Sequence, residues 1–423
     1  MRYRRYVFVY KRKMRRRERK TSETAMTDSP CAVVVGAELN GLGVVRSLAR
    51  GGVPTIVMDT TYGRAAMWSR FSRPVIVEKL YGRKLVDGLL ALQRGRDHRP
   101  VLLLADEMVV HTVSTHREEL KRAYRFQLPS RDTVKILDNK ARFHEFAERH
   151  GLPVPRSIVV SRVSDLEKLG NLRFPVIVKP ADKRLVYLRR TQRLHMPADI
   201  KEARELCRTL LHTVGEFVVQ EWIDGPVSNI YFCLFYRGDD QARTLFFSGR
   251  KILSHPPTAG STALCIAAPE VAGQLEPFTA AFIERCDYRG LGSLEFKWDQ
   301  TRRIFVVIEP TVGRTDWQEE VATLNGVNIP LFAYRDLIGL PNSQPACSSQ
   351  PVAWQESWHR WRGRSALKTR LPIYDGYWRV SDPMPSLAYY ATEAGKVAGQ
   401  MTRRLFAAAP AKRHQRVAGG KQS

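Results

Sequence analysis

Short apolar runs alternate with stretches of helical spacing through the first quarter of the chain. Cys31–Gly36 (CAVVVG) ends in glycine, as buried strands often do, and Gly41–Arg50 follows with helical periodicity. Pro54–Met58 (PTIVM) and Val101–Leu104 (VLLL) are further apolar runs, and we expect a helix around Lys84–Gln93. Strand, helix, strand, helix is the pattern of a parallel sheet with covering helices. The sequence therefore predicts an α/β lobe at its beginning.

The pattern changes near Pro129. An amphipathic helix is expected at Asn139–His150, and a further helix at Pro269–Arg285. The apolar runs between and after them have the spacing of a meander, which predicts an α+β region with a largely antiparallel sheet. The expected strands are 158–160, 176–178, 217–220, 231–236, 244–247, 291–298 and 304–308.

Composition shifts divide the chain further, because 423 residues exceed one ordinary core. We expect a disordered basic arm at 1–30, the parallel-sheet lobe at 31–128, the α+β domain at 129–340, a linker at 341–352, a Trp-rich helical segment at 353–406 and a disordered basic tail at 407–423.

The charge balance is strongly basic, with 68 Lys+Arg against 42 Asp+Glu and a net charge of +26. Eleven basic residues crowd the first twenty positions. This arm is either an inert tail that precedes a true start at Met26, or a weak contact for nucleic acid or an anionic membrane surface. The basic body suits a negatively charged substrate.

Cysteines and apolar stretches limit the compartment. The six cysteines are scattered without a CxxC pair, which indicates free thiols in a reducing environment. No apolar stretch approaches the ~20 residues needed to span a bilayer. We therefore expect a cytoplasmic protein.

A glycine loop (GAELNGLG) joins the first strand to the first helix. Gly36, Gly41 and Gly43 would present backbone N–H groups and a helix N-terminus to an anion. Asp59 ends the next strand, where a ribose-binding acid lies in dinucleotide sites, although the spacing is not GxGxxG. NAD(P) binding, binding of a substrate carboxylate and a plain tight turn all stay open.

Two lysines stand at the ends of predicted elements. Lys140 opens a helix, where a cation is unfavourable, so it is either solvated or beside an anion. Lys179 ends the apolar strand of FPVIVKP, so it either reaches solvent or meets an anion. After a further strand comes Gln220–Gly225 (QEWIDG), whose exposed backbone groups could take an adenine edge and whose acids could accept ribose hydroxyls.

Two acids carry the strongest signal. Glu295 in GSLEFKW and Glu309 in FVVIEP lie on the two strands of one predicted hairpin, at comparable depth from its turn. Two buried like charges repel unless a cation lies between them, and Mg²⁺ with substrate phosphates suits such a pair. The alternative is a salt-bridged sheet face, in which Glu295 pairs with Lys297 or Arg302.

In this order the features resemble the ATP-grasp superfamily, and among its members the carboxylate–amine ligases. The resemblance implies a Rossmann-like lobe before the grasp domain and an ATP- and Mg²⁺-dependent ligase that forms an amide through an acyl phosphate. It implies phosphate contacts from Lys140 and Lys179, and metal ligation by Glu295 and Glu309. It places adenine and ribose at Gln220, Glu221, Trp222, Ile223 and Asp224.

The sequence departs from this family at several positions. Thr311 stands where an asparagine metal ligand is common, and Arg314 lies one place beyond the expected arginine. Arg250 and Lys251 with the loop Ser254–Thr262 resemble a mobile loop that closes over phosphates; Arg250 or Arg314 would stabilise the oxyanion of the acyl transfer.

The partners implied are a small-molecule carboxylate and an amine, with no specific nucleic acid, and an oligomer is possible. Two rival hypotheses are an NAD(P)-dependent oxidoreductase built on the glycine loop, and a basic protein that binds nucleic acid or an anionic surface.

Overall fold

The computed structural model describes residues 29–182, 194–213, 215–257, 260–342, 348, 350–356 and 370–395. The basic tail, all but the last two residues of the basic arm, Cys347 and two members of the Trp cluster, Trp358 and Trp361, lie outside the described residues. No helix in the described part of the chain combines the length and the apolar character that crossing a membrane would require.

A four-stranded parallel sheet, in the order β3-β2-β1-β4, forms the first lobe. The predicted strands are present, and β3 is an addition: its sequence, SRPVI, is polar and contains proline, as suits an edge strand, and gives no apolar signal. The strands are β1 (Ala32–Val35), β2 (Thr55–Asp59), β3 (Ser72–Ile76) and β4 (Val101–Leu104). The helices are α2 (Leu39–Ala49), α3 (Gly82–Gln93), α4 (Glu107–Thr115) and α5 (Arg117–Ala123).

A seven-stranded sheet, in the order β12-β11-β8-β9-β10-β13-β14, forms the largest layer. Its pairs are antiparallel except for β13 with β14, two strands that the sequence does not predict. The strands are β8 (Ile230–Arg237), β9 (Thr244–His255), β10 (Ser261–Ala267), β11 (Gly290–Asp299), β12 (Ile304–Val312), β13 (Ala353–Gln355) and β14 (Ile373–Asp375). The associated helices are α10 (Ala272–Arg285), α11 (Glu320–Leu324) and α12 (Ile329–Leu337).

The two sheets share their cores. Because alternate strand residues point to opposite faces, Val33 and Val34 of β1 enter different clusters. Val33 packs in one cluster with Phe296 of β11 and with α10, and Val34 packs in the other with Phe232 of β8 and with α2 and α12. The parallel-sheet lobe is therefore packed firmly against the large sheet.

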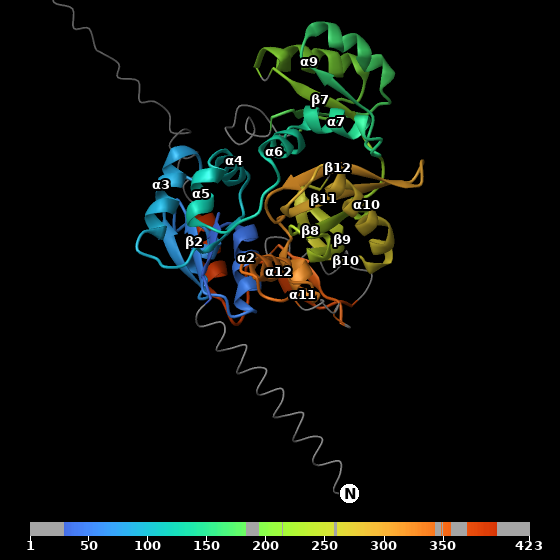
Figure 1. Ribbon diagram of the computed structural model, residues 1–423. Helices are drawn as coiled ribbons and strands as arrows, with labels where there is room; N and C mark the ends of the chain where they lie inside the picture. Colours follow the sequence, from blue (N-terminus) through green and yellow to red (C-terminus); the bar gives the residue numbers. More distant parts are fainter. Residues whose placement is uncertain are drawn as a thin grey trace, which may run out of the picture.

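A small lobe stands apart at the top of Figure 1. Its three antiparallel strands run in the order β5-β7-β6, and α9 covers one face over a core of its own. The opposite face carries Lys179 and Gln220 and looks toward α7. The elements of the lobe are β5 (Ser157–Val160), β6 (Val176–Pro180), α9 (Ile200–Thr213) and β7 (Phe217–Glu221). Two helices precede it, α6 (Arg131–Asp138) and α7 (Lys140–Arg149), and most of their buried apolar side chains belong to the core that also contains α10 and β12. The predicted fold class is thereby confirmed.

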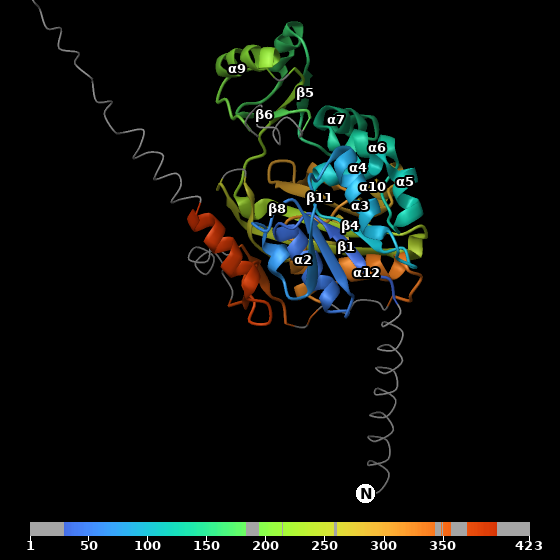
Figure 2. The same cartoon turned by 90° about the vertical axis from the view of Figure 1, so that its left-hand side faces the viewer.

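The C-terminal segment folds back on α2, and its helix (residues 384–395) is drawn red in Figure 2. Arg46 of α2 is buried and donates to the carbonyl oxygens of Gly376 and Tyr377 at 2.8 and 2.7 Å. It also pairs with Asp382 at 3.1 Å. These bonds satisfy a guanidinium that would otherwise be costly to bury, so they fix this segment to the first lobe.

Candidate active site

Glu295 of β11 and Glu309 of β12 are direct cross-strand partners. Directly opposite residues of an antiparallel pair project to the same face, so the two carboxylates share one side of the large sheet. The register shifts immediately afterwards, where Phe296 pairs with Val307 and Ile308 is the extra residue of a bulge. The arrangement expected from the hairpin is thus present, with the acids beside an irregularity in the ladder.

Each of these acids has a lysine partner in the structure. The ammonium of Lys140, at the start of α7, lies 3.0 Å from a carboxylate oxygen of Glu309. Lys251 of β9, a buried side chain, forms an ion pair with Glu295. The alternative partners considered for Glu295 are engaged elsewhere: Arg302 pairs with Asp299 at 2.7 Å, and Lys297 donates to backbone carbonyls. Two acids are therefore balanced by two cations.

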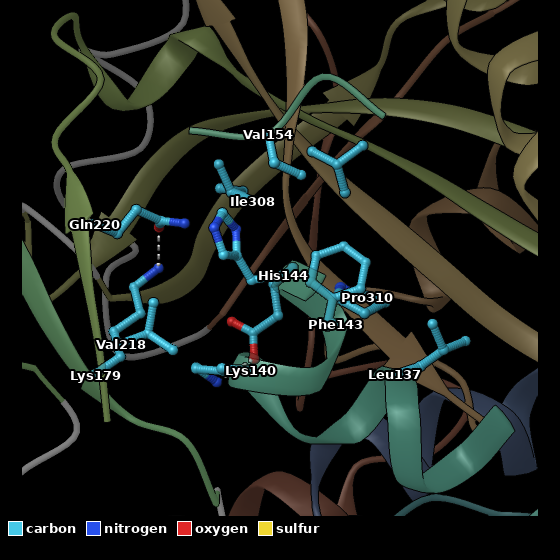
Figure 3. A pocket seen from close by; sticks show the side chains of 12 residues that line it. Leu137, Lys140, Phe143, His144, Val154, Lys179, Val218, Gln220, Ile308 and Pro310 are labelled. Atoms are coloured by element: carbon cyan, nitrogen blue, oxygen red, sulfur yellow. Dashed lines mark hydrogen bonds and ion pairs between the residues drawn. The ribbon is translucent and has the colours of Figure 1, made fainter. Parts of the chain in front are cut away.

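A small pocket lies between α7, the small lobe and β12 (Figure 3). Lys179 enters it from β6 and donates to the amide oxygen of Gln220 on β7 at 3.0 Å. Lys140 of α7 and Glu309 of β12 also line this pocket. The other lining residues are mostly apolar: Leu137, Phe143, His144, Val154, Val218, Val307, Ile308 and Pro310. Apolar walls combined with two lysines suit a ligand that carries both apolar surface and an anion.

The segment after β7 differs from the expectation of exposed backbone donors. The N–H of Glu221 donates to the carbonyl of Arg156 at 2.9 Å, and that of Trp222 donates to Pro175 at 3.1 Å. The prediction was wrong for these two groups because the strand pairing of β7 continues on both sides. The Glu221 carboxylate accepts from the N–H of Arg173, Ile223 is buried and Asp224 is exposed.

Lys297 fixes this segment to the large sheet. Its buried ammonium donates to the carbonyls of Gly225 and Pro226, at 2.9 and 3.1 Å, and lies 5.8 Å from the ring centre of Trp222. Burial lowers the pKa of Lys297, while the charge of Glu295 opposes that shift. Sequence reasoning assigned Lys297 no anchoring role; its position in the apolar run LEFKW was the signal for a buried, fully bonded lysine.

Arg250 and Lys251 lie within β9 rather than on a loop, contrary to the expectation from the sequence. Alternate residues of a strand face opposite ways, so Lys251 reaches Glu295 while Arg250 turns to the other face. There Arg250 stacks over the ring of Tyr231 at 5.1 Å. An oxyanion role for Arg250 is wrong for this reason. The tip of the predicted closing loop, at 258 and 259, lies outside the described residues.

Thr311 and Arg314 follow Glu309 along the chain, at and just beyond the end of β12. Thr311 is the register partner of Ser293 and shares the face of the two acids. Arg314 follows the end of β12; it donates to the carbonyl of Thr315 at 3.0 Å and lies 3.9 Å from the Glu107 carboxylate. A single weak ion pair leaves the Arg314 side chain able to take a second anion.

The glycine loop is arranged for a tight turn. Gly36 has φ of +100°, and a side chain at Gly41 would lie 1.9 Å from the Gly36 carbonyl oxygen. The carboxylate of Asp59 is buried and accepts the N–H of Ala37 at 2.8 Å. Asp59 is therefore used in shaping the loop and is not exposed to bind a ribose, which argues against the dinucleotide hypothesis.

Comparisons with known proteins bear on the fold. No family model matches the sequence. The chain is 23% identical over 334 residues to D-aspartate ligase of Enterococcus faecium (strain Aus0004), which covers 72% of this chain and 76% of that protein. Its structure resembles N5-carboxyaminoimidazole synthetase of Staphylococcus aureus complexed with ADP, with a TM-score of 0.60, 15% identity and coverage of 77% of this chain and 81% of that one. The chain has the ATP-grasp fold.

A second solved structure similar to this chain is the biotin carboxylase domain of Hydrogenobacter thermophilus 2-oxoglutarate carboxylase, in complex with MgADP, ADP and bicarbonate. The TM-score is 0.57 at 16% identity, with coverage of 74% of this chain and 71% of that one. The sequence relative is thus a ligase, and both solved structures share the fold of this chain.

The donor set of this ATP-grasp site fits Mg²⁺. Glu295 and Glu309 are oxygen donors on one face, and within the described residues no cluster of three or more His, Cys, Asp or Glu supplies a closed metal cage. Mg²⁺ is commonly bound by one or two carboxylates, with substrate phosphates and water completing its shell. Glu295 and Glu309 would supply the two carboxylates, and the neighbouring lysines would attract the phosphates that complete the shell of the ion.

Proposed function

We propose that this chain is an ATP- and Mg²⁺-dependent carboxylate–amine ligase that forms an amide through an acyl phosphate. The observation that carries the proposal is the cross-strand pair Glu295–Glu309, with Lys140 bonded to Glu309 and lining the same pocket as Lys179. An acid pair balanced by lysines is arranged to exchange its ion pairs for a metal-bound polyphosphate.

In the proposed first step, a substrate carboxylate oxygen attacks the γ-phosphorus of ATP and ADP leaves. Lys140 and Lys179 would bind the phosphates from the two walls of the pocket, and Lys251 would approach from the floor beside Glu295. Glu295 and Glu309 would hold Mg²⁺, with Thr311 as a weaker neighbour; the ion supplies charge neutralisation for phosphoryl transfer. The apolar walls, such as Phe143 and Ile308, exclude water from the nucleotide.

In the second step an amine attacks the acyl phosphate, and the carbonyl oxygen becomes an oxyanion. Arg314 is the cation available for it, because Arg250 faces the opposite side of the sheet. One well-placed donor of this kind is worth ~10²–10³ in rate. The purine end of ATP would lie against the segment Glu221–Asp224, which Lys297 and the pairing of β7 hold in place.

The substrates are proposed to be small molecules, one bearing a carboxylate and one an amine. D-aspartate is the first acid to test, because a D-aspartate ligase is a sequence relative. The test is a screen of amino acids and other carboxylic acids, with and without amines, that measures ADP release in the presence of Mg-ATP. ADP release that depends on no acid would contradict the proposal, as would activity that persists in excess EDTA.

Glu309→Gln gives the sharper test, because the amide keeps the size of the side chain and removes its charge. We expect ADP release to fall by about 100-fold or more, since a metal ligand is lost. Glu276→Gln is the matched control: Glu276 is a half-buried acid on α10, at the other face of the sheet, where it accepts from Ser248 at 3.2 Å. It should leave turnover unchanged. Full activity in Glu309→Gln would remove Glu309 from the metal site.

A further inference from the structure

Asp316 follows β12, and its hydrogen-bond donors in the described part of the chain are all neutral. One carboxylate oxygen accepts from the Ser293 hydroxyl at 3.1 Å and from the Gln318 side chain at 3.2 Å; the other accepts from the N–H of Trp317 at 2.8 Å. Across the described ranges, no lysine, arginine or histidine forms an ion pair with it. Glu295 and Glu309, by contrast, each have a lysine. Among the residues that the structure describes, Asp316 is thus a negative charge without a counter-charge.

This carboxylate lies beside the proposed reaction centre. Ser293, which donates to it, precedes Glu295 by two positions on β11 and therefore shares its face, about 7 Å away along the strand. Thr311 is the register partner of Ser293 and continues the same floor. Asp316 remains partly exposed, whereas Ser293 is buried. One carboxylate oxygen of Asp316 is therefore bonded to a buried residue of β11, while the side chain as a whole remains partly exposed.

The first lobe fixes the backbone that carries Asp316. Asn40, buried near the start of α2, donates from its amide nitrogen to the carbonyl of Thr315 at 2.9 Å and to that of Ala105 at 3.0 Å. The Thr315 hydroxyl donates back to the Asn40 side-chain oxygen at 2.5 Å. Both lobes therefore determine where Asp316 stands, and such a doubly anchored loop is suited to a binding residue.

An acceptor amine is the substrate whose charge this acid would balance. Free alkyl amines are protonated near neutral pH, since their pKa values lie close to that of lysine. We infer that Asp316 binds the ammonium group of the acceptor amine and so determines that the second substrate is a cation. This inference rests on the proposed ligase function and adds the chemical class of the acceptor.

Atoms and charge balance in this transfer. The ammonium bound at Asp316 gives one proton to solvent and becomes a neutral amine. Its nitrogen lone pair forms the C–N bond with the acyl carbon, the C–O bond to phosphate breaks, and phosphate leaves with that electron pair. The second amine proton ends on phosphate. Asp316 increases the local concentration of the amine and orients it, while Arg314 stabilises the oxyanion.

The experiment compares a charged and an uncharged nucleophile in Asp316→Asn. Hydroxylamine is uncharged at neutral pH and converts an acyl phosphate to a hydroxamate, so it reports the first step without needing an ammonium site. With the acid and the alkyl amine identified in the ADP-release screen, we expect the KM for the amine to rise about 10- to 100-fold, because one hydrogen bond to a charged group is lost. Hydroxamate formation and the KM for Mg-ATP should change less than about 2-fold. Glu276→Gln should change none of the three.

Two other outcomes would overturn the inference. If Asp316 merely shapes its turn, the Asp316→Asn variant would preserve or disturb both nucleophiles equally, because the amide can still accept from Ser293 and Trp317. If Asp316 were a metal ligand, hydroxamate formation and the KM for Mg-ATP would both be impaired. A wild-type chain that forms neither ADP nor hydroxamate with any acid would instead refute the ligase proposal itself. Circular dichroism of the variant shows whether its fold is retained.

Discussion

The first prediction concerns Glu319, a buried carboxyl group whose pKa is raised in the folded protein. It is 1% exposed and directly precedes α11, where its carboxylate faces Ser47 and Thr323. Burial raises its pKa from the ordinary value of 4.5 to about 8, and the charge of Glu320 acts in the same direction. The two hydroxyls oppose the shift without cancelling it. At neutral pH the folded protein therefore contains a protonated glutamic acid.

The sign of the effect follows from proton counting. Between pH 4.5 and 8 the folded state keeps a proton on Glu319 that the unfolded chain has released, so the free energy of unfolding falls as pH rises. Each pH unit between the two pKa values is worth about 1.4 kcal/mol. From pH 5.5 to 7.5, near the upper pKa, the loss attributable to this side chain is about 2.5 kcal/mol.

Glu319→Gln should remove this dependence, because the amide has no proton to lose and can still accept from Ser47. We expect the variant to gain about 2.5 kcal/mol on the wild type between pH 5.5 and 7.5, measured by urea unfolding followed by circular dichroism. Other groups titrate alike in both proteins and cancel in the difference. Glu205→Gln, on the exposed side of α9, is the control and should show no trend. Parallel curves for Glu319→Gln and wild type would refute the reasoning.

Two further predictions concern the segment after β7 and the thiols. Lys297→Met should raise the KM for ATP about 10-fold while kcat changes less, because the carbonyls of Gly225 and Pro226 lose their donor; an equal change in the exposed control Lys168→Met would contradict this. Burial raises the pKa of four cysteines: Cys207, Cys233, Cys265 and Cys286. Alkylation of these thiols at pH 8, mapped by mass spectrometry, should be slow in the folded protein and fast in guanidinium. Rapid labelling of the folded chain would contradict this prediction, because it would show that the thiols are accessible.

Local patterns are sufficient for most of the elements and for the approximate depth of the acid pair. Counting back from the pair Asp299–Ile304 would place Glu295 opposite Ile308, and the bulge at Ile308 is what brings Glu309 into register with Glu295. Lys179 stands out because a lysine ending an apolar strand needs an anion or solvent, and it is found in the pocket. The resemblance to ATP-grasp proteins then orders the site along the chain, and the fold agrees with it.

Tertiary contacts decide what the sequence could not. Arg250 and Lys251 are adjacent and chemically alike, and only the pairing of β9 with β8 assigns Lys251 to the face of Glu295. The role of Asp316 depends on a serine on another strand, 23 residues earlier in the chain. The N–H of Trp222, expected to be free, bonds to Pro175, a partner outside the local motif. Such partners have no periodic signal, because they depend on how separate segments meet.

The separate core of the small lobe has a consequence for how the protein takes up its nucleotide. The buried residues of that core all lie between positions 160 and 219, so a tilt of the lobe over the large sheet would disturb only its small buried contact with α7, where Ala141 packs with Ala181 and Val218. Lys179 moves with the lobe, whereas Lys251 and the two acids stay with the sheet. We expect the negative charge of the triphosphate to attract Lys179 on the small lobe and Lys251 on the large sheet and so to hold the lobe closed. Transfer of the γ-phosphate would reduce the charge on the nucleotide, which would weaken this attraction and favour release of ADP.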